Sequence, residues 1–113
     1  MELRKEKKPA VTVFHIKGSV GQEDTALFLS ELGKAAESNS PRIVLDVSEM
    51  HYICSMALSA LVKARNQAKS GGGDVRIADA NKVTKNLLEA TNLNRVFMVF
   101  PSLHDALESF SES

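Results

Sequence analysis

The sequence has few of the residues that mark disulfide-rich, nucleic-acid-binding or membrane-spanning proteins. It contains one cysteine, Cys54, so no disulfide can form within the chain. It has no tryptophan, one tyrosine and a formal net charge of zero, which excludes the basic surface of a nucleic-acid reader. No apolar run approaches the ~20 residues of a membrane span, and the charged N-terminus does not resemble a signal peptide. We therefore expect a cytoplasmic protein that binds neither nucleic acid nor membrane.

What remains is the composition of an ordinary globular domain. Hydrophobic residues make up 43% of the chain and charged residues 25%. A length of 113 residues suits one domain with its own core, and no linker or repeat divides it. We expect residues 1–113 to form a single domain.

Hydrophobic patterns alternate between strand and helix along the chain. The predicted strands are residues 3–8, 11–16, 43–45, 75–77 and 96–100, and the predicted helices are 25–37, 55–69, 81–91 and a short one from 102. In the third helix, Val83, Leu87 and Ala90 are expected to face inward. Strands that alternate with helices predict an α/β fold with a mixed, mostly parallel sheet of four to five strands and about four helices.

Two loops, residues 18–24 and 48–54, follow predicted strands and precede predicted helices. In such units the loops lie at the carboxyl edge of the sheet, where open α/β sheets place their sites. We therefore expect Asp24, Asp46 and Ser55 to be near neighbours. Asp24 is also expected to cap the first helix by accepting from its free amides.

Ser55, at the predicted start of the second helix, has two interpretations. A serine there commonly caps the helix with its hydroxyl. A helix start also tolerates an added phosphate, because free amides and positive partial charge gather there. Spacing alone favours the cap.

A family resemblance adds to this reading. The run Arg42–Leu61 resembles the central segment of the anti-sigma-factor antagonists, members of the STAS domain family: an apolar strand ending in Asp or Asn, a short loop, then Ser and spaced leucines. The family's other segments are resembled, in the right order, by Lys17–Val20, Gly72–Val75, Leu87–Leu93 and Ala106–Leu107. Nearly the whole chain is covered.

The resemblance implies a bacterial binding protein with no catalytic, metal or cofactor site. Such a protein binds an anti-sigma factor that is also a serine kinase, and thereby regulates transcription indirectly. The kinase phosphorylates the serine that Ser55 matches, and a metal-dependent serine phosphatase reverses the reaction. The expected partner-binding residues are Asp24, Asp46, Cys54, Ser55, Met56 and Ser59.

The sequence departs from the family pattern around Ser55. Cys54 stands where the family has Asp, Met56 where it has a small residue, and Ala57 where it has Gly. Gly21 replaces an acidic residue of the first loop, for which Glu23 or Asp24 can stand in. Cys54 is expected to be a small buried residue, whereas Met56 either packs in the core or contacts a partner. An alternative function is a phosphorylation-independent STAS interaction module in a signalling or transport assembly.

A small hydrolase is the third hypothesis. His51 with Cys54 or Ser55 suggests a nucleophile dyad, and Asp46 could complete a triad. No Gly-x-Ser-x-Gly elbow accompanies them. The three histidines, among them His15 and His104, are too scattered for a recognised metal pattern. We expect His15 to be a hydrogen-bonded structural residue.

Overall fold

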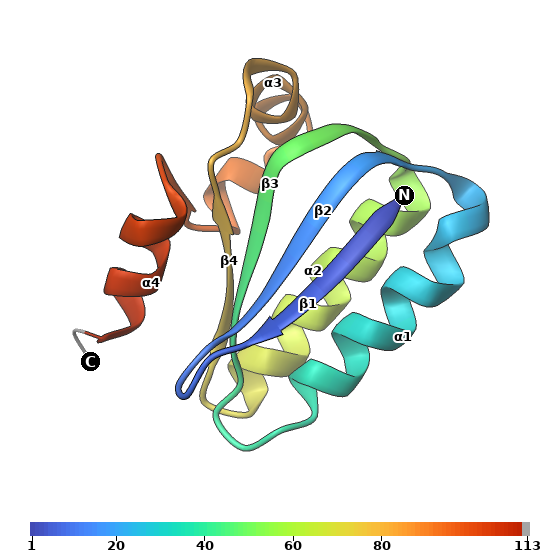
Figure 1. Cartoon of the computed structure of the whole chain (residues 1–113). Coiled ribbons are helices and arrows are strands. Elements are labelled where there is room, and N and C mark those ends of the chain that lie inside the picture. Colours follow the sequence, from blue (N-terminus) through green and yellow to red (C-terminus); the bar gives the residue numbers. More distant parts are fainter. Residues whose placement is uncertain (112–113) are drawn as a thin grey trace.

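Five strands form one mixed sheet in the computed structural model, which describes residues 1–111 (Figure 1). The strands are β1 (Glu2–Lys7), β2 (Thr12–Val20), β3 (Arg42–Ile53), β4 (Asp74–Ala78) and β5 (Val99–Phe100). The α-helices are α1 (Thr25–Ala36), α2 (Ser55–Ser70), α3 (Lys82–Ala90) and α4 (Leu103–Ser111), and two 3-10 turns are η1 (Gln22–Asp24) and η2 (Leu93–Arg95). The predicted fold class is confirmed. Within residues 1–111, no helix has the length and apolar content needed to cross a bilayer.

The strands lie in the sheet in the order of the chain, β1-β2-β3-β4-β5. β1 and β2 form the expected antiparallel hairpin, and the other neighbours pair in parallel. Right-handed crossovers between successive neighbouring strands place their helices on the same face. Accordingly α1 and α2 lie side by side on one face, α4 covers the other, and α3 sits at the carboxyl edge (Figure 1).

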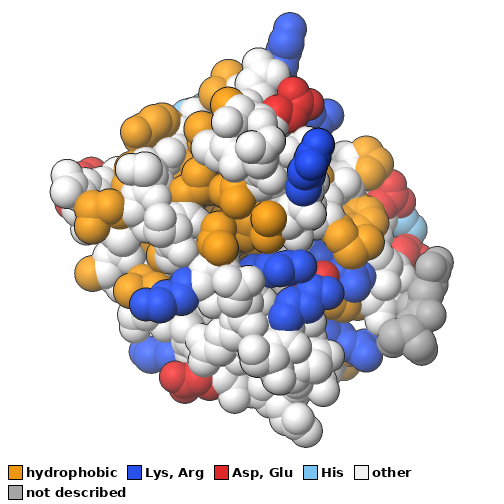
Figure 2. All heavy atoms as spheres, turned by 180° about the vertical axis from the view of Figure 1, so that it is seen from behind, with side chains coloured by type: hydrophobic (Ala, Val, Ile, Leu, Met, Phe, Trp, Pro, Cys, Tyr) orange, Lys and Arg blue, Asp and Glu red, His pale blue; other side chains and the backbone are white. Residues whose placement is uncertain are grey.

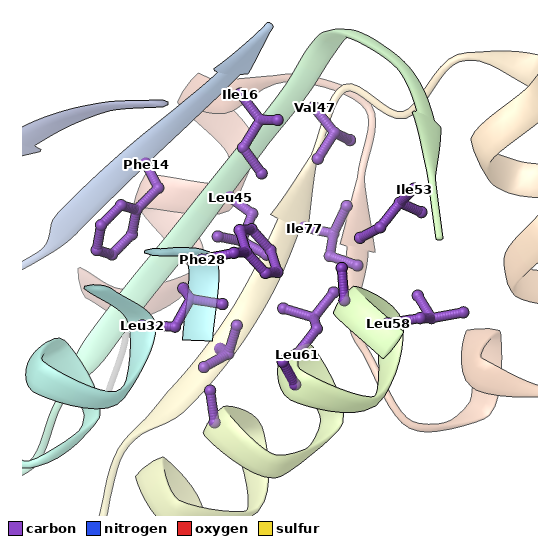
Figure 3. Close-up of a cluster of buried hydrophobic side chains, with 14 of the residues drawn as sticks. Phe14, Ile16, Phe28, Leu32, Leu45, Val47, Ile53, Leu58, Leu61 and Ile77 are labelled. Atoms are coloured by element: carbon purple, nitrogen blue, oxygen red, sulfur yellow. The ribbon is translucent and has the colours of Figure 1, made fainter. Parts of the chain in front are cut away.

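The larger core fills the space between the sheet and the pair α1 and α2 (Figure 3). Phe14, Leu45 and Ile77 enter it from the strands, and Phe28 and Leu61 from the helices. A smaller core on the other face joins strand residues to Ala106 and Phe110 of α4; its members are Val11, Val13, Val44, Ala78, Ala106 and Phe110. The predicted strand 43–45 is continuously apolar because its side chains alternate between these two cores.

The three glycines after α2 form the predicted turn. Gly72 adopts a positive φ of +88°, which favours glycine. At Gly73 a Cβ atom would lie 1.7 Å from the carbonyl oxygen of Pro41, so only glycine lets the turn pass this close to the residue before β3. This close approach brings the end of α2 against the start of β3 and β4.

The predicted loop 48–54 is wrong, because β3 continues to Ile53. Beyond Asp46, β3 no longer pairs with β4 and follows β2 alone, with two register shifts. Met50 and Ile53 remain buried there while His51 and Tyr52 are exposed. The irregular spacing hides this half of the strand from a test based on alternation. β2 is likewise longer than predicted and continues to Val20.

Two further predictions differ from the structure near the carboxyl edge. In α3 the buried residues are Thr84 and Leu88, and Leu87 packs against the core as predicted, while Val83 and Ala90 are exposed, so the inward face is rotated from the predicted one. The predicted strand 96–100 is reduced to Val99–Phe100. The preceding residues form η2 and a buried turn residue, Phe97, which pack under α3 instead of joining the sheet.

Candidate functional site at the start of α2

Ser55 is the first residue of α2 and is exposed. The residue before it, Cys54, has extended backbone angles (φ −75°, ψ 161°), and its carbonyl accepts from the amide of Leu58 at 3.0 Å. Cys54 is therefore the N-cap, and the prediction that Ser55 caps the helix is wrong by one position. Ser55 already lies inside the helix, whereas the N-cap residue precedes the first helical residue.

Cys54 lies beside the free amides of the first turn. It is partly exposed, so the expectation of a buried residue is wrong. Its sulfur lies 3.6 Å from the hydroxyl of Thr25 in α1. The backbone amide of Ala57 and, after it, this hydroxyl lower the pKa of the Cys54 thiol below its ordinary value. The site thus offers stabilisation to negative charge next to Ser55.

The turn between β2 and α1 packs against the start of α2, as expected for the first loop. The backbone amide of Cys54 donates to the carbonyl of Val20 at 2.9 Å, and the side-chain Nε2 of Gln22 donates to the sulfur of Met56 at 3.5 Å. Asp24 belongs to this turn, but its carboxylate accepts from the amide of Gly21 at 2.9 Å. Asp24 is the N-cap residue of α1 as predicted, but its side chain makes no cap hydrogen bond, so the predicted bond to the free amides of α1 is wrong.

Asp46 is not part of this site, contrary to the prediction. It pairs with His15 in the middle of β3, whereas Ile53, next to Cys54, pairs with Val20. About 23 Å of strand separates Asp46 from Ile53 at ~3.3 Å per residue. The prediction failed because Asp46 was taken as the end of its strand.

Asp46 instead joins a hydrogen-bonded group across three strands. His15 contacts Asp46 through Nδ1 at 2.7 Å and Glu6 through Nε2 at 2.8 Å, as expected for a structural histidine. Burial raises the pKa of Asp46, but hydrogen bonds from Ser48 and His15 outweigh it, so the pKa lies below its ordinary value. The hydrogen bond from His15, followed by Lys8, also lowers the pKa of Glu6.

Exposed apolar side chains surround Ser55. Met56 is 53% exposed and Tyr52 is 55% exposed, so of the two possibilities for Met56 the structure shows the exposed one. An open groove runs alongside, lined by Ser55, Leu58, Ser59, Val62, Thr91 and Leu93. Viewed from behind, hydrophobic side chains gather on one face of the molecule (Figure 2). Such a mixed apolar and polar surface suits contact with a protein.

Two features of this surface were missed at the sequence level. Gln22 contacts Met56, and Thr91 and Leu93 form the far wall of the groove. Nothing in their local pattern distinguishes them from other polar or turn residues. They join the site only because α3 and η2 fold back over the edge of the sheet beside α2.

The described residues of the site were compared with the requirements of a metal centre and of a hydrolase. Among residues 1–111, no group of three His, Cys, Asp or Glu side chains is placed to hold a metal ion. The thiol of Cys54 is directed to Thr25, which cannot act as a general base in a Cys-His dyad. The arrangement offers an exposed hydroxyl, free amides and an apolar surround.

Comparisons with known proteins agree with this architecture. A candidate anti-sigma factor antagonist of Thermotoga neapolitana is 28% identical over 67 residues, and this stretch spans 59% of the present chain and 59% of that relative. The crystal structure of an anti-sigma factor antagonist from Mycobacterium paratuberculosis has a TM-score of 0.83 and 21% identity, covering 96% of this chain and 92% of that one. The Bacillus cell fate determinant SpoIIAA, in its phosphorylated form, has a TM-score of 0.76 and 9% identity, covering 96% and 99%.

The family is established by a match to a protein-family model. Residues 2–106 match the STAS domain, which spans the sheet, α1 to α3 and the first turn of α4. The structural neighbours share the same fold over nearly their whole length. The chain therefore belongs to the STAS domain family.

Proposed function

We propose that this protein is an anti-sigma factor antagonist that binds its partner through the start of α2 and is switched off by phosphorylation of Ser55. It acts by binding and not by catalysis. Its partner is an anti-sigma factor with serine kinase activity, and a serine phosphatase restores the unmodified form. Such partners would place the protein in the bacterial cytoplasm.

The observation that carries this proposal is the exposure of Ser55 at the first position of α2, between Met56 and the groove of Leu58 and Leu93. A kinase can reach the hydroxyl without unfolding the helix. The free amides of the first turn and the helix dipole stabilise the added charge of about −1.5 to −2. The phosphate would then stand in the middle of an apolar contact surface, where desolvation opposes docking.

A second candidate is a STAS module that binds constitutively. The observation that favours it is the absence of a carboxylate at position 54, where the sequence has Cys54. Asp24, the acidic residue of the neighbouring turn, is held by the amide of Gly21. A kinase that recognises a carboxylate beside the serine would find no carboxylate at position 54, and that of Asp24 is already hydrogen-bonded to Gly21.

The test measures binding of the purified protein to the anti-sigma factors encoded by its host, with and without ATP. We expect Ser55→Asp to weaken binding by about tenfold or more, since charge is added where the partner excludes water. Ser55→Ala should bind like the wild type and stay unmodified with ATP. Ser30→Asp is the control, because Ser30 is equally exposed but lies midway along α1.

The outcomes separate the two candidates. Binding that is equal in wild type and Ser55→Asp would reject the switch and support the constitutive module. Failure of every host anti-sigma factor to bind the unmodified protein would reject the antagonist role itself.

A further inference from the structure

A basic recess lies at the opposite end of α2 from Ser55. It has a volume of about 230 Å³ and is lined by Arg42, Lys69, Gly72, Gly73, Asp74, Arg76, Ser109 and Phe110. These residues come from the first positions of β3 and β4, the end of α2, the glycine turn and α4. Lys and Arg side chains also gather on the face shown in Figure 2. The recess shares no residue with the groove at Ser55.

One buried carboxylate stands among several cations at this place. Asp74 is 5% exposed, and its oxygens lie 3.1 Å from Nε of Arg76, 3.7 Å from Nζ of Lys69 and 3.8 Å from Nε of Arg65. Three positive charges thus face one negative charge, leaving an excess of two. The end of α2 contributes about −0.5 charge, which leaves the recess strongly positive.

The donors of this recess are held in place. Arg76 donates from Nη1 to the hydroxyl of Ser109 at 2.7 Å, and its guanidinium carbon lies 3.9 Å from the centroid of the Phe110 ring. Together with the bond to Asp74, these contacts fix the plane of the guanidinium while leaving N–H groups for another acceptor. The fixed plane suits an oxyanion that binds two donors at once.

Arg65 places a further positive charge beside Asp74. Its Nε is buried and has no hydrogen-bond acceptor among the described residues, since 3.8 Å to Asp74 is too long for such a bond. Arg65 does not line the recess, so it contributes positive charge next to Asp74 and is not itself a donor to a ligand in the recess. Lys69, one helical turn further on, is half-exposed and can reach into the same space.

We propose that this recess binds a phosphate group, carried by inorganic phosphate or by a small phosphomonoester. A dianionic phosphate matches the excess of two positive charges. A monocarboxylate would leave one cation unmatched. A nucleic acid would need basic residues along an extended surface, whereas the basic residues of this recess are gathered at one place. The protein would then bind a small molecule at one end of α2 and its protein partner at the other end.

The test is a titration of the 15N-labelled protein, followed by NMR, with sodium phosphate and with sodium chloride at matched ionic strength. We expect saturable shifts of the backbone amides of residues 72–76 with phosphate alone, and an apparent dissociation constant of about 1 mM or tighter. Lys69→Ala should weaken binding about tenfold, as expected for one charged hydrogen bond. Lys63→Ala should bind normally, because Lys63 is also exposed but lies on another face of α2.

Glycerol 3-phosphate serves as the second probe and distinguishes the two sources of the phosphate. Equal affinity for both probes would mean that the recess recognises only the phosphate group. Tighter binding of glycerol 3-phosphate would mean that the ligand of the recess is a phosphomonoester. The proposal is overturned if chloride produces the same shifts, if the shifts do not saturate, or if Lys63→Ala and Lys69→Ala weaken them equally. Unchanged melting temperatures of the two variants without phosphate would show that both remain folded.

Discussion

At the residue scale, the site depends on two adjacent residues, Cys54 and Ser55, which have different structural roles. Cys54 closes the strand and caps the helix, and Ser55 is thereby left exposed. The family pattern that the sequence resembles has Asp at the position of Cys54. A carboxylate at an N-cap is ionised at neutral pH, whereas a thiol is mostly neutral. The substitution therefore removes a fixed negative charge beside Ser55 and puts a titratable sulfur in its place.

The sulfur of Cys54 should titrate below its ordinary value in the folded protein. The amide of Ala57 and the hydroxyl of Thr25 stabilise the thiolate. The rate of alkylation by iodoacetamide should therefore rise at lower pH in the folded protein than in the same protein unfolded in urea. Thr25→Val should move the midpoint upward, because it removes the hydroxyl at 3.6 Å and keeps the shape. Identical pH profiles for folded and unfolded protein would contradict this account.

At the element scale, one side chain ties α3 to the strand that leads to Ser55. Asn81 accepts from the amide of Thr84 at 2.9 Å and so caps α3. The same side chain donates from Nδ2 to the carbonyl of Met50 in β3 at 3.0 Å. This second bond satisfies a carbonyl in the part of β3 that β4 no longer covers. Asn81 therefore holds the carboxyl edge on which the partner surface rests.

Substitution of Asn81 can separate these two bonds. Asn81→Ala should lower the free energy of unfolding by about 2 kcal/mol, because it removes the helix cap and the bond to Met50. Asn81→Asp retains the cap acceptor and loses only the donor, so it should cost about 1 kcal/mol. Urea denaturation of the three proteins provides the measurement. Equal losses for both variants would mean that the bond to Met50 accounts for the whole effect.

The elements predicted from sequence are those whose patterns arise locally. α1, α2 and β4 were located within about two residues, because caps, glycines and continuous apolar runs mark them. The second half of β3 and the rotation of α3 were not. Both depend on packing between distant segments: His51 and Tyr52 are exposed although they lie in a strand, and Thr84 is buried although it is polar.

The candidate site divides in the same way. Ser55, Met56 and the neighbouring turn were placed together correctly, since they flank strand ends that the parallel sheet brings to one edge. Asp46 was placed there wrongly, because the length of β3 is set by its pairing with β2. The walls of the groove at Thr91 and Leu93 could not be predicted, as their position depends on the path of the chain after α3.

At the scale of the whole molecule, α2 connects two different surfaces. Its first turn carries Ser55 at the carboxyl edge of the sheet, and its last turns carry Arg65 and Lys69 at the opposite edge. Helix dipoles favour this division, since anions are stabilised at the start of a helix and cations at its end. The sheet order keeps α2 over β3 and β4, so both surfaces rest on the most buried strands.

The face of the sheet opposite α1 and α2 is covered only in part. α4 packs over β3, β4 and β5 and reaches Val13 of β2, whereas the neighbouring parts of β1 and of β2 at His15 are partly exposed. There His15 of β2 joins Glu6 of β1 and Asp46 of β3 by hydrogen bonds of 2.8 and 2.7 Å. On this face, polar bonds between strands therefore take the place that an apolar core has elsewhere.

This group should make stability depend on pH in the acid range. The pKa values of Glu6 and Asp46 lie below their ordinary values of 4.5 and 3.8. A lowered pKa adds stability that is present above the ordinary value and is lost as the pH falls through the folded value. The free energy of unfolding should therefore decrease from about pH 4.5 downward. Because His15 lowers both values, His15→Leu should make this decrease shallower, as measured by urea denaturation at successive pH values.

His104 provides the matched control for this measurement. It is exposed on α4, and within residues 1–111 its ion pair is with Glu108 on the same helix, at 3.7 Å. Exposed ion pairs contribute little to the free energy of unfolding, so His104→Leu should leave its dependence on pH unchanged. An equal change of slope in the two variants would assign the effect to the general loss of a positive charge. A shallower slope in His15→Leu alone would assign it to the bonds that join the three strands.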